Sequence, residues 1–387
     1  MHNLNAIVVG AGMGGLTAGI ALQQAGYTVE LYDRVKQLRP AGAAISLWSN
    51  GVKVLNRLGL GKAVADIGGQ MDRMAYYSST GETLTEFSLQ PLIQDVGQRP
   101  YPMARTDLQA LLLNRFGAEH LRLDSTCVGI EQDEHSVTAI FEDGHRATGD
   151  VLIAADGTRS RLRSEVLGAP IERNYVGYVN WNGLVDARED LAPKDSWVTY
   201  VGDHKRASIM PIGGDRFYFF FDVPLPKGTA SQPDLYREEL SQFFKGWASP
   251  VQLLIQRLDP QTTNRIEIHD IDPLPRLIRG RVALIGDAAH GTAPDLGQGG
   301  CQAMEDALVL TNYLQTTNIS VEDALSRYQT ARLDRVADII KRARKRSDVT
   351  HGKNPETTKQ WYANLKHEDG RDIMSAIAHT ILSGPLN

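Results

Sequence analysis

A glycine pattern close to the N-terminus constrains the fold more than any other feature of this sequence. Gly10, Gly12 and Gly15 form a GxGxxG turn between a short apolar run, Ala6–Val9, and a segment with helical spacing, Leu16–Gln24. In such a turn the first glycine allows the tight bend, the second lets the backbone approach a pyrophosphate, and the third allows the helix to pack closely on the strand. The pattern therefore predicts a strand–turn–helix unit that can bind a dinucleotide at its helix N-terminus.

An acidic residue supports this interpretation of the glycine turn. Thr28–Asp33 has the composition of a second short strand, and Asp33 lies 18 residues after Gly15 (33 − 15). A carboxylate at the end of that strand can accept a hydrogen bond from a ribose hydroxyl. The three segments form a βαβ unit, which predicts a parallel sheet. An ordinary glycine-rich turn is the alternative. The combination of the strand, the glycine turn, the helix and Asp33 favours dinucleotide binding.

A second apolar run also ends at an aspartate. Val151–Ala155 predicts a strand that stops at Asp156-Gly157, and Ser160 and Arg163 follow in a predicted helix. Taken alone, this segment can equally be a turn that caps a helix, so its assignment depends on the rest of the chain.

A third segment combines an aspartate with a glycine-rich loop. Val282–Ile285 predicts a strand ending at Gly286-Asp287, where Asp287 could accept hydrogen bonds from polyol hydroxyls. A helical stretch from about Cys301 follows a loop that contains Pro294, Gly297, Gln298, Gly299 and Gly300. Such a loop can place backbone N–H groups against a flat ring, and the helix N-terminus can stabilise negative charge there. A glycine-rich loop without a ligand is the alternative.

The middle of the chain has a different pattern. It contains β-rich runs separated by turn residues, which predicts an antiparallel sheet over Tyr175–Val185, Trp197–Val201, Arg206–Pro211 and Arg216–Val223. The strand–helix signature returns near Arg281–Asp287 and helical patterns continue to about Lys345. We therefore expect an α/β fold: a discontinuous Rossmann-like nucleotide-binding domain with an inserted, mainly antiparallel β-sheet domain and C-terminal helices.

Composition excludes several classes of function. The formal net charge of −5 argues against a nucleic-acid partner, and the basic run Lys341–Arg346 is better explained as a solvated helix end. The two cysteines, Cys127 and Cys301, form no CxxC motif, and the ten histidines show no metal-ligand spacing, so we expect no metal site and a reducing cytoplasm. His290, which lies close after Gly286-Asp287, is expected to pack near the bound dinucleotide. The chain begins without a charged secretory n-region and has no run long and apolar enough for a membrane span.

The three aspartate and glycine motifs occur in the order seen in the family that contains para-hydroxybenzoate hydroxylase, and the sequence resembles that family over most of its length. The resemblance implies a single-component flavoprotein monooxygenase with non-covalent FAD, NADH or NADPH as reductant and O2 as oxidant. The Asp156-Gly157 motif is associated in the family with both FAD and NAD(P)H. Cys301 departs from the asparagine that many members carry at this position.

Four further runs, 178–183, 216–226, 259–270 and 381–385, allow a narrower comparison. In these runs the sequence resembles a bacterial branch of this family, the FAD-dependent urate hydroxylases. This resemblance implies NADH-dependent hydroxylation of urate at C5 to 5-hydroxyisourate through a flavin C4a-hydroperoxide. It also implies that Asn180, Arg206 and Tyr218 bind the substrate, with Arg206 and Tyr218 in catalytic positions. The expected cofactor contacts are Gly10, Gly12, Gly14, Gly15, Asp33, Arg34, Ser46, Arg105, Val128, Asp156, Asp287, Gly297, Gln298, Gly299, Gly300 and Cys301.

The strand and helix patterns also divide the chain into domains. The FAD-binding domain is expected at residues 1–75, 100–174 and 273–345, the substrate-binding sheet at 76–99 and 175–272, and a C-terminal helical extension at 346–387. Substrate chemistry fits these residues, because arginine offers a planar fork of donors to an anionic, carbonyl-rich rim.

Strand register provides a test that needs no resemblance. If residues 213–215 form a three-residue hairpin loop, Met210 pairs with Tyr218 and Arg206 shares their face of the sheet. A two-residue loop would place Arg206 and Tyr218 on opposite faces. Three alternatives remain open at this point: a sister hydroxylase acting on a phenolic acid or hydroxynicotinate, a flavin reductase or halogenase-like enzyme that inserts no oxygen, and a non-catalytic FAD-binding module.

Overall fold

In the computed structural model, residues 4–38 and 42–386 are described, and their strands form four sheets. A six-stranded sheet has the order β17-β18-β11-β1-β2-β7 and is parallel except for its β17 edge. Its strands are β17 (Ile278–Arg279), β18 (Val282–Leu284), β11 (Val151–Ala154), β1 (Asn5–Val9), β2 (Thr28–Tyr32) and β7 (Leu121–Arg122). The three predicted motifs thus follow β1, β11 and β18, which are neighbours in this sheet.

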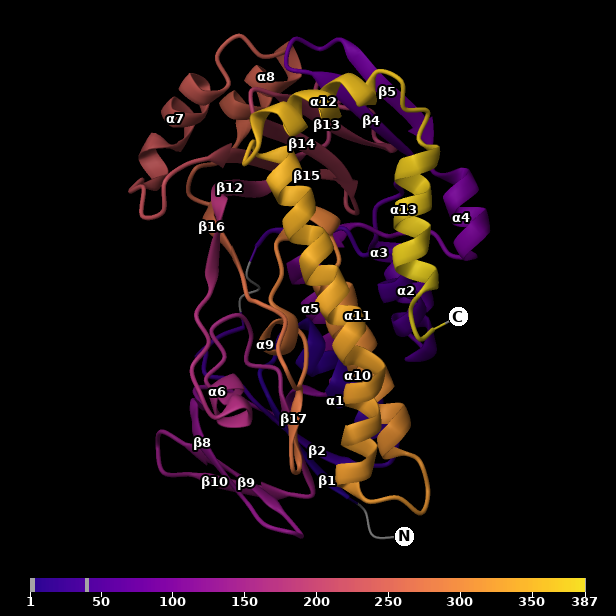
Figure 1. Cartoon of the computed structure of the whole chain (residues 1–387), viewed down its shortest axis with the longest axis vertical. Coiled ribbons are helices and arrows are strands. Elements are labelled where there is room, and N and C mark those ends of the chain that lie inside the picture. Colours follow the sequence, from indigo (N-terminus) through magenta and orange to yellow (C-terminus); the bar gives the residue numbers. More distant parts are fainter. Residues whose placement is uncertain (1–3, 39–41, 387) are drawn as a thin grey trace.

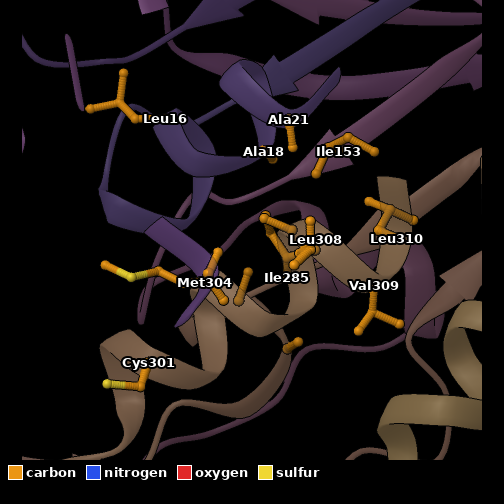
Figure 2. Close-up of a cluster of buried hydrophobic side chains, with 14 of the residues drawn as sticks. Leu16, Ala18, Ala21, Ile153, Ile285, Cys301, Met304, Leu308, Val309 and Leu310 are labelled. Carbon is orange, nitrogen blue, oxygen red and sulfur yellow. The ribbon is translucent and has the colours of Figure 1, made fainter. Parts of the chain in front are cut away.

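Helices of both sequence ends pack together on the six-stranded sheet. Side chains of α1 (Met13–Gln24) and α10 (Gly299–Leu314) pack with Ile285, which directly follows β18, and with Ile153 on β11 (Figure 2). This buried core brings the N-terminal glycine turn close to the glycine-rich loop before α10. The other helices of this half are α2 (Ser49–Arg57), α3 (Gly61–Ile67), α5 (Arg105–Phe116), α6 (Leu162–Leu167) and α9 (Asp287–His290).

Two small sheets complete the nucleotide-binding half. A three-stranded antiparallel sheet contains β10 (Arg146–Gly149), β9 (Val137–Phe141) and β8 (Cys127–Gln132), and a two-stranded one pairs β3 (Ala44–Ile45) with β6 (Met103–Ala104). Short 3-10 turns occur at 118–120, 233–235 and 294–296.

The inserted sheet has seven strands in the order β16-β12-β15-β14-β13-β4-β5 and is antiparallel except for the β13–β4 pair. Its strands are β16 (Asn264–Asp270), β12 (Asn174–Asp186), β15 (Arg216–Pro224), β14 (Lys205–Ile212), β13 (Ser196–Gly202), β4 (Arg73–Ser78) and β5 (Thr83–Ser88). The four β-rich runs of the sequence became β12 to β15. The α/β fold with its inserted antiparallel sheet is therefore confirmed, whereas the domain boundaries stay a prediction.

Alternation of residue type gives the seven-stranded sheet two different faces. One face is apolar and packs against α7 (Tyr236–Phe243) and α8 (Ser249–Arg257), with Trp181, Phe217, Phe219 and Phe221 at its centre. The other face carries Asn180, Asn182, Arg206, Ser208, Tyr218 and Asp222. In Figure 1 this sheet lies above the six-stranded sheet, with α7 and α8 on its far side, so the polar face is turned toward the nucleotide-binding half.

A long helix connects the two halves. α11 (Val321–Thr350) extends from the six-stranded sheet to the inserted sheet, and α12 (Pro355–Leu365) lies at its far end (Figure 1). α13 (Arg371–Leu382) runs beside α11, whose Arg335 and Arg342 both donate to Thr380, and packs against α4 (Gln90–Val96). The basic run 341–346 lies in the last turns of α11. The prediction that this run is simply solvated is wrong in part: Arg344 pairs with Asp270, and Arg346 lies 4.3 Å over the ring of Trp361.

None of the helices formed by the described residues has the length and apolar character that crossing a membrane requires.

Candidate active site

The glycine turn leaves space at one position and is tightly packed at two others. A Cβ added at Gly10, whose φ is +111°, would lie 2.2 Å from the carbonyl oxygen of Ala155, and one at Gly15 would lie 1.8 Å from the carbonyl oxygen of Gly10. A Cβ at Gly12 would meet nothing within 4 Å. Tight packing at the first and third glycines and open backbone at the second match what a pyrophosphate site needs.

Asp33 lies beside that turn. Its Oδ2 accepts a hydrogen bond from the backbone N–H of Ala11 at 2.6 Å, and its Oδ1 accepts one from Val35 at 3.0 Å. An ionised carboxylate has about four lone-pair positions, so it can still accept from a ribose hydroxyl. Arg34 is exposed next to it. The residues fit the adenosine side of FAD, although each cofactor contact stays a prediction.

The Asp156 carboxylate caps the start of α6. Its oxygens accept hydrogen bonds from the Ser160 hydroxyl and from the backbone N–H groups of Arg161 and Leu162, at 2.6, 2.9 and 3.2 Å. The turn-and-cap interpretation of this motif therefore describes its local structure, and its predicted role toward the cofactor stays untested.

Arg163, which the sequence analysis did not single out as functional, connects the second motif to the third. It is 2% exposed, and its guanidinium donates to the carbonyl oxygens of Ala288 and Asp287, both at 2.7 Å. Burial lowers the pKa of this guanidinium. A buried arginine donating to two consecutive carbonyls holds the backbone of α9 in place, so Arg163 orients the Asp287 segment.

The loop before α10 presents its backbone rather than its side chains. A Cβ at Gly299 would have only Thr292 and Asp287 side-chain atoms nearby, at 3.7 and 3.9 Å, whereas a Cβ at Gly300 would lie 2.5 Å from Ile45. Among the described residues, no hydrogen bond to the Asp287 carboxylate is found. This combination of an open glycine, a free carboxylate and a helix N-terminus fits a ligand with polar and anionic groups.

The side chains of Gln298 and Cys301 point away from such a ligand, into the protein. Gln298 is 2% exposed and accepts a hydrogen bond from Asn50, and Cys301 is 0% exposed and packs against Gly51. Burial raises the pKa of the Cys301 thiol to about 12. Any contact of these two residues with FAD would therefore involve their backbone groups.

A buried ionic cluster lies next to the loop that precedes α10. Glu305 and Asp306 are fully buried and pair with Arg332 at 2.7 and 2.6 Å. Asp306 also accepts a hydrogen bond from the backbone N–H of Gly286 and contacts His290 Nε2 at 2.6 Å. His290 is thus a buried partner of Asp306, and its predicted packing near the cofactor stays a prediction.

The remaining expected cofactor residues lie at three separate places. Ser46 borders the loop, since a Cβ at Gly297 would lie 3.1 Å from its hydroxyl. Arg105 begins α5 and donates to the carbonyl oxygen of Ala44 at 3.0 Å. Val128 is 40% exposed on β8. The structure therefore brings Ser46 to the loop of residues 297–301, whereas Val128 lies on the three-stranded sheet.

The three expected substrate residues share one face of the seven-stranded sheet. Ile212 pairs with Arg216, so residues 213–215 form the three-residue loop, and Met210 pairs with Tyr218 as predicted. In the same register Arg206 pairs with Asp222, and Asp222 also pairs with Asn180 across β12 and β15. The register test is passed, and a one-residue slip would have failed it.

Asp222 holds two of these residues and was missed by the sequence analysis. Its Oδ1 accepts from Asn180 Nδ2 at 2.6 Å, and its Oδ2 accepts from Arg206 Nε at 2.7 Å. The side-chain oxygen of Asn180, Oδ1, in turn accepts a hydrogen bond from Asn182 Nδ2 at 2.7 Å. Asn180 thus retains only one amide hydrogen for a ligand, fewer groups than the sequence suggested.

Arg206 is buried between two carboxylates. Its Nη2 lies 2.6 Å from Asp222 Oδ2 and 3.2 Å from Asp295 Oδ1, and its side chain is 12% exposed. Burial alone would lower the pKa of Arg206, but the two carboxylates raise it. Its Nη1 has no hydrogen bond among the described residues, so one end of the guanidinium remains for a ligand.

Phe220 joins Arg206 to Tyr218 on this face. Its ring centroid lies 5.1 Å from the Arg206 guanidinium and 5.6 Å from the Tyr218 ring. Burial raises the pKa of Tyr218, so its hydroxyl stays protonated and can donate. A planar guest on this face would meet a cation, an aromatic face and a hydroxyl donor. Alternation along β15 could have identified Phe220 from the sequence.

No group of three or more histidine, cysteine, aspartate or glutamate side chains within the described ranges is arranged to hold a metal ion.

Comparison with known proteins gives a consistent result. Residues 3–343 match the family described as FAD binding domain. The chain is 53% identical to the FAD-dependent urate hydroxylase of Klebsiella pneumoniae subsp. pneumoniae over 385 residues, which is 99% of this chain and 100% of the relative. It is 49% identical to the enzyme of the same name from Mycolicibacterium vanbaalenii over 386 residues, covering 99% of this chain and 98% of the relative.

A solved structure is equally similar. The crystal structure of Klebsiella pneumoniae HpxO complexed with FAD and uric acid superposes with a TM-score of 0.97 at 51% identity, covering 100% of this chain and 98% of the other. The similarity extends over both halves of the fold, including the seven-stranded sheet and the loop before α10.

Proposed function

This chain belongs to the FAD-binding-domain family of flavoproteins, and from that premise we propose that it is a monooxygenase that hydroxylates urate at C5, with NADH as reductant and O2 as oxidant. The geometry that supports the proposal is the polar face of the seven-stranded sheet, where Arg206, Phe220 and Tyr218 lie together. Relatives that are aligned over nearly the whole chain are named FAD-dependent urate hydroxylase, which supports urate as the substrate and FAD as the cofactor.

Urate has the shape and charge that this face would bind. It is planar, acidic and surrounded by carbonyl oxygens and N–H groups. Arg206 Nη1 can donate to an anionic edge, and the remaining Asn180 amide hydrogen and the Tyr218 hydroxyl can donate to carbonyl oxygens. Phe220 offers an aromatic face beside them. Recognition would therefore combine charge, hydrogen bonds and ring contact.

The chemistry divides between cofactor and protein. Reduced FAD would activate O2 and supply one oxygen atom, while the second leaves as water and NADH provides the two electrons. The protein's part is to bind the substrate as an anion, which is the electron-rich form that accepts an electrophilic oxygen most readily. A guanidinium at the purine rim favours that anion, because an opposite charge stabilises the ionised form.

The cofactor would lie across the carboxyl ends of β1, β11 and β18. We propose the pyrophosphate at Gly10, Gly12, Gly14 and Gly15 and the adenosine near Asp33, Arg34 and Val128. The flavin side would meet Ser46, Arg105, Asp287 and the loop of residues 297–301, with Asp156 close by. Residues 1–75, 100–174 and 273–345 would form the FAD-binding domain and residues 76–99 and 175–272 the substrate-binding domain, with 346–387 as the extension. NADH would bind transiently, since the chain has only one GxGxxG motif.

The proposal is tested by NADH oxidation with the FAD-loaded protein and a panel of purines and phenolic acids. We expect urate to accelerate NADH oxidation and to be consumed in step, with 5-hydroxyisourate as the first product. NADH oxidation with urate recovered unchanged would make urate an effector only. Turnover of a phenolic acid or hydroxynicotinate in its place would identify a sister hydroxylase.

A further inference from the structure

We propose that Asp295 is a positioning residue that couples the loop of residues 297–301 to Arg206, so that the substrate-binding guanidinium and the cofactor-binding loop keep a fixed mutual position. The proposal rests on the function proposed above. Asp295 does not have to touch substrate or cofactor to act in this way, because its effect is transmitted through Arg206.

The two carboxylates that bind Arg206 come from different parts of the fold. Asp222 is its cross-strand neighbour within the seven-stranded sheet. Asp295 lies in the 3-10 turn 294–296, immediately before Gly297, and its side chain is 0% exposed. Asp222 therefore only holds Arg206 within its own sheet, whereas Asp295 joins that sheet to the loop before α10.

Asp295 is itself held from two sides. The Tyr178 hydroxyl, on β12, donates to its Oδ2 at 2.7 Å. His351, directly after α11, places Nε2 3.6 Å from Oδ1 and stacks on Tyr178 with ring centroids 3.9 Å apart. The 3.6 Å distance is longer than an ordinary hydrogen bond, so we treat His351 as an electrostatic and packing neighbour.

These contacts determine which part of Arg206 a substrate can reach. Nε and Nη2 are occupied by Asp222 and Asp295, which leaves Nη1 as the end presented to a ligand. The Nε hydrogen bond and the Nη2 ion pair with Asp222 both end on the same oxygen, Oδ2. A guanidinium bound at one oxygen can pivot about it, so Asp295 is the second point that fixes the plane.

Asp295→Asn is the direct perturbation, because it keeps the size of the side chain and removes its charge. We expect the variant to bind FAD and to be reduced by NADH. Urate should bind about tenfold more weakly to the oxidised enzyme, as expected when a charge-assisted contact is misdirected. The ratio of 5-hydroxyisourate formed to NADH consumed should fall, with hydrogen peroxide making up the difference. Tyr178→Phe should show a smaller effect in the same direction, since it removes one hydrogen bond to Asp295.

The matched control is Asp270→Asn. Asp270 is 1% exposed and also pairs with an arginine, Arg344, at 2.8 Å, but it has no contact with Arg206. It should lose thermal stability and retain the wild-type product ratio. Urate affinity is read independently of turnover, from the change in flavin absorbance on titration.

Two outcomes would overturn the proposal: a wild-type urate affinity and product ratio in Asp295→Asn, or equal losses of both in Asp270→Asn. A wild-type protein that does not hydroxylate urate would instead refute the proposed function. The coupling itself can then still be measured by a double-mutant cycle of Arg206→Gln and Asp295→Asn in urea unfolding. Additive effects in that cycle would show that the two residues act independently.

Discussion

Replacing Arg206 with glutamine should leave two buried carboxylates without their shared cation. The side chains of Asp222 and Asp295 are each 0% exposed, and Arg206 is 12% exposed. Removing one partner of a buried ion pair typically costs about 3–5 kcal/mol, because the remaining charge stays buried without compensation. We expect the free energy of unfolding of Arg206→Gln to fall by about this amount at pH 7.

The loss should depend on pH in a defined direction. Burial alone would raise the pKa of Asp295, but His351 and Arg206 outweigh it and lower the pKa from 3.8 to about 2. A carboxylate whose folded pKa lies below its unfolded value stabilises the fold above the unfolded pKa, and this contribution is lost as the pH falls through the folded pKa. At about 1.4 kcal/mol per pKa unit, Asp295 contributes roughly 2–3 kcal/mol in the wild type.

The difference between the two proteins should therefore shrink as the pH falls from about 4 toward 2, where Asp295 becomes protonated in both. The assay is urea unfolding of the FAD-loaded proteins, followed by circular dichroism at several pH values. Arg344→Gln is the control, because Arg344 pairs with Asp270 and Asp272 but is 31% exposed, so its loss should be smaller. A loss below about 1 kcal/mol for Arg206→Gln, or a loss that does not change with pH, would refute the reasoning.

Three further predictions concern function and cofactor binding. In turnover, Arg206→Gln should bind FAD and accept electrons from NADH, but its rate of urate hydroxylation should fall by about 10²–10³-fold. Tyr218→Phe should be less affected, and equal ratios of product to NADH in both variants and the wild type would contradict this prediction. Gly12→Val should fold with wild-type thermal stability and bind FAD weakly, whereas Gly15→Val should lose both thermal stability and FAD binding. Differential scanning calorimetry and flavin titration of the apoprotein measure the two properties, and an unaltered FAD affinity of Gly12→Val would place the pyrophosphate elsewhere. Arg163→Met should raise the FAD dissociation constant by releasing the carbonyls that it holds, and an unchanged constant would show that the α9 backbone is held without it.

Local patterns in the sequence predicted much of the fold. The glycine turn, the strand endings at Asp33 and Asp287 and the β-rich runs all depend on neighbours within a few residues, so their positions could be inferred without the structure. The relation of Met210 to Tyr218 depended on the length of the loop at 213–215, which the sequence left open and which the structure shows to be three residues.

The partners of Arg206 could not be predicted in this way. Asp295 lies 89 positions further along the chain, and Asp222 lies 16 positions away. Pairings over such distances depend on how the sheet and the loop before α10 pack, which no local periodicity encodes. The same reason explains why the basic run 341–346 was interpreted as solvated, since Asp270, the partner of Arg344, lies on β16.

The two interpretations of Asp156 show a further limit. Its local environment is that of a helix cap, with three donors from residues 160–162. The resemblance to flavoproteins adds a role toward the cofactor, which stays a prediction. An aspartate that caps a helix can also contact a cofactor only through lone pairs or backbone groups that the cap leaves available. The local structure of this motif therefore does not determine its function.

Turnover under isotope-labelled O2 measures urate hydroxylation by this protein without ambiguity about the source of the oxygen. The FAD-loaded protein is mixed with urate and NADH, and the labelled product and the NADH consumed are quantified together. We expect one labelled oxygen atom in each 5-hydroxyisourate and close to one product molecule per NADH. NADH oxidation that yields only hydrogen peroxide, or a product without label from O2, would contradict it.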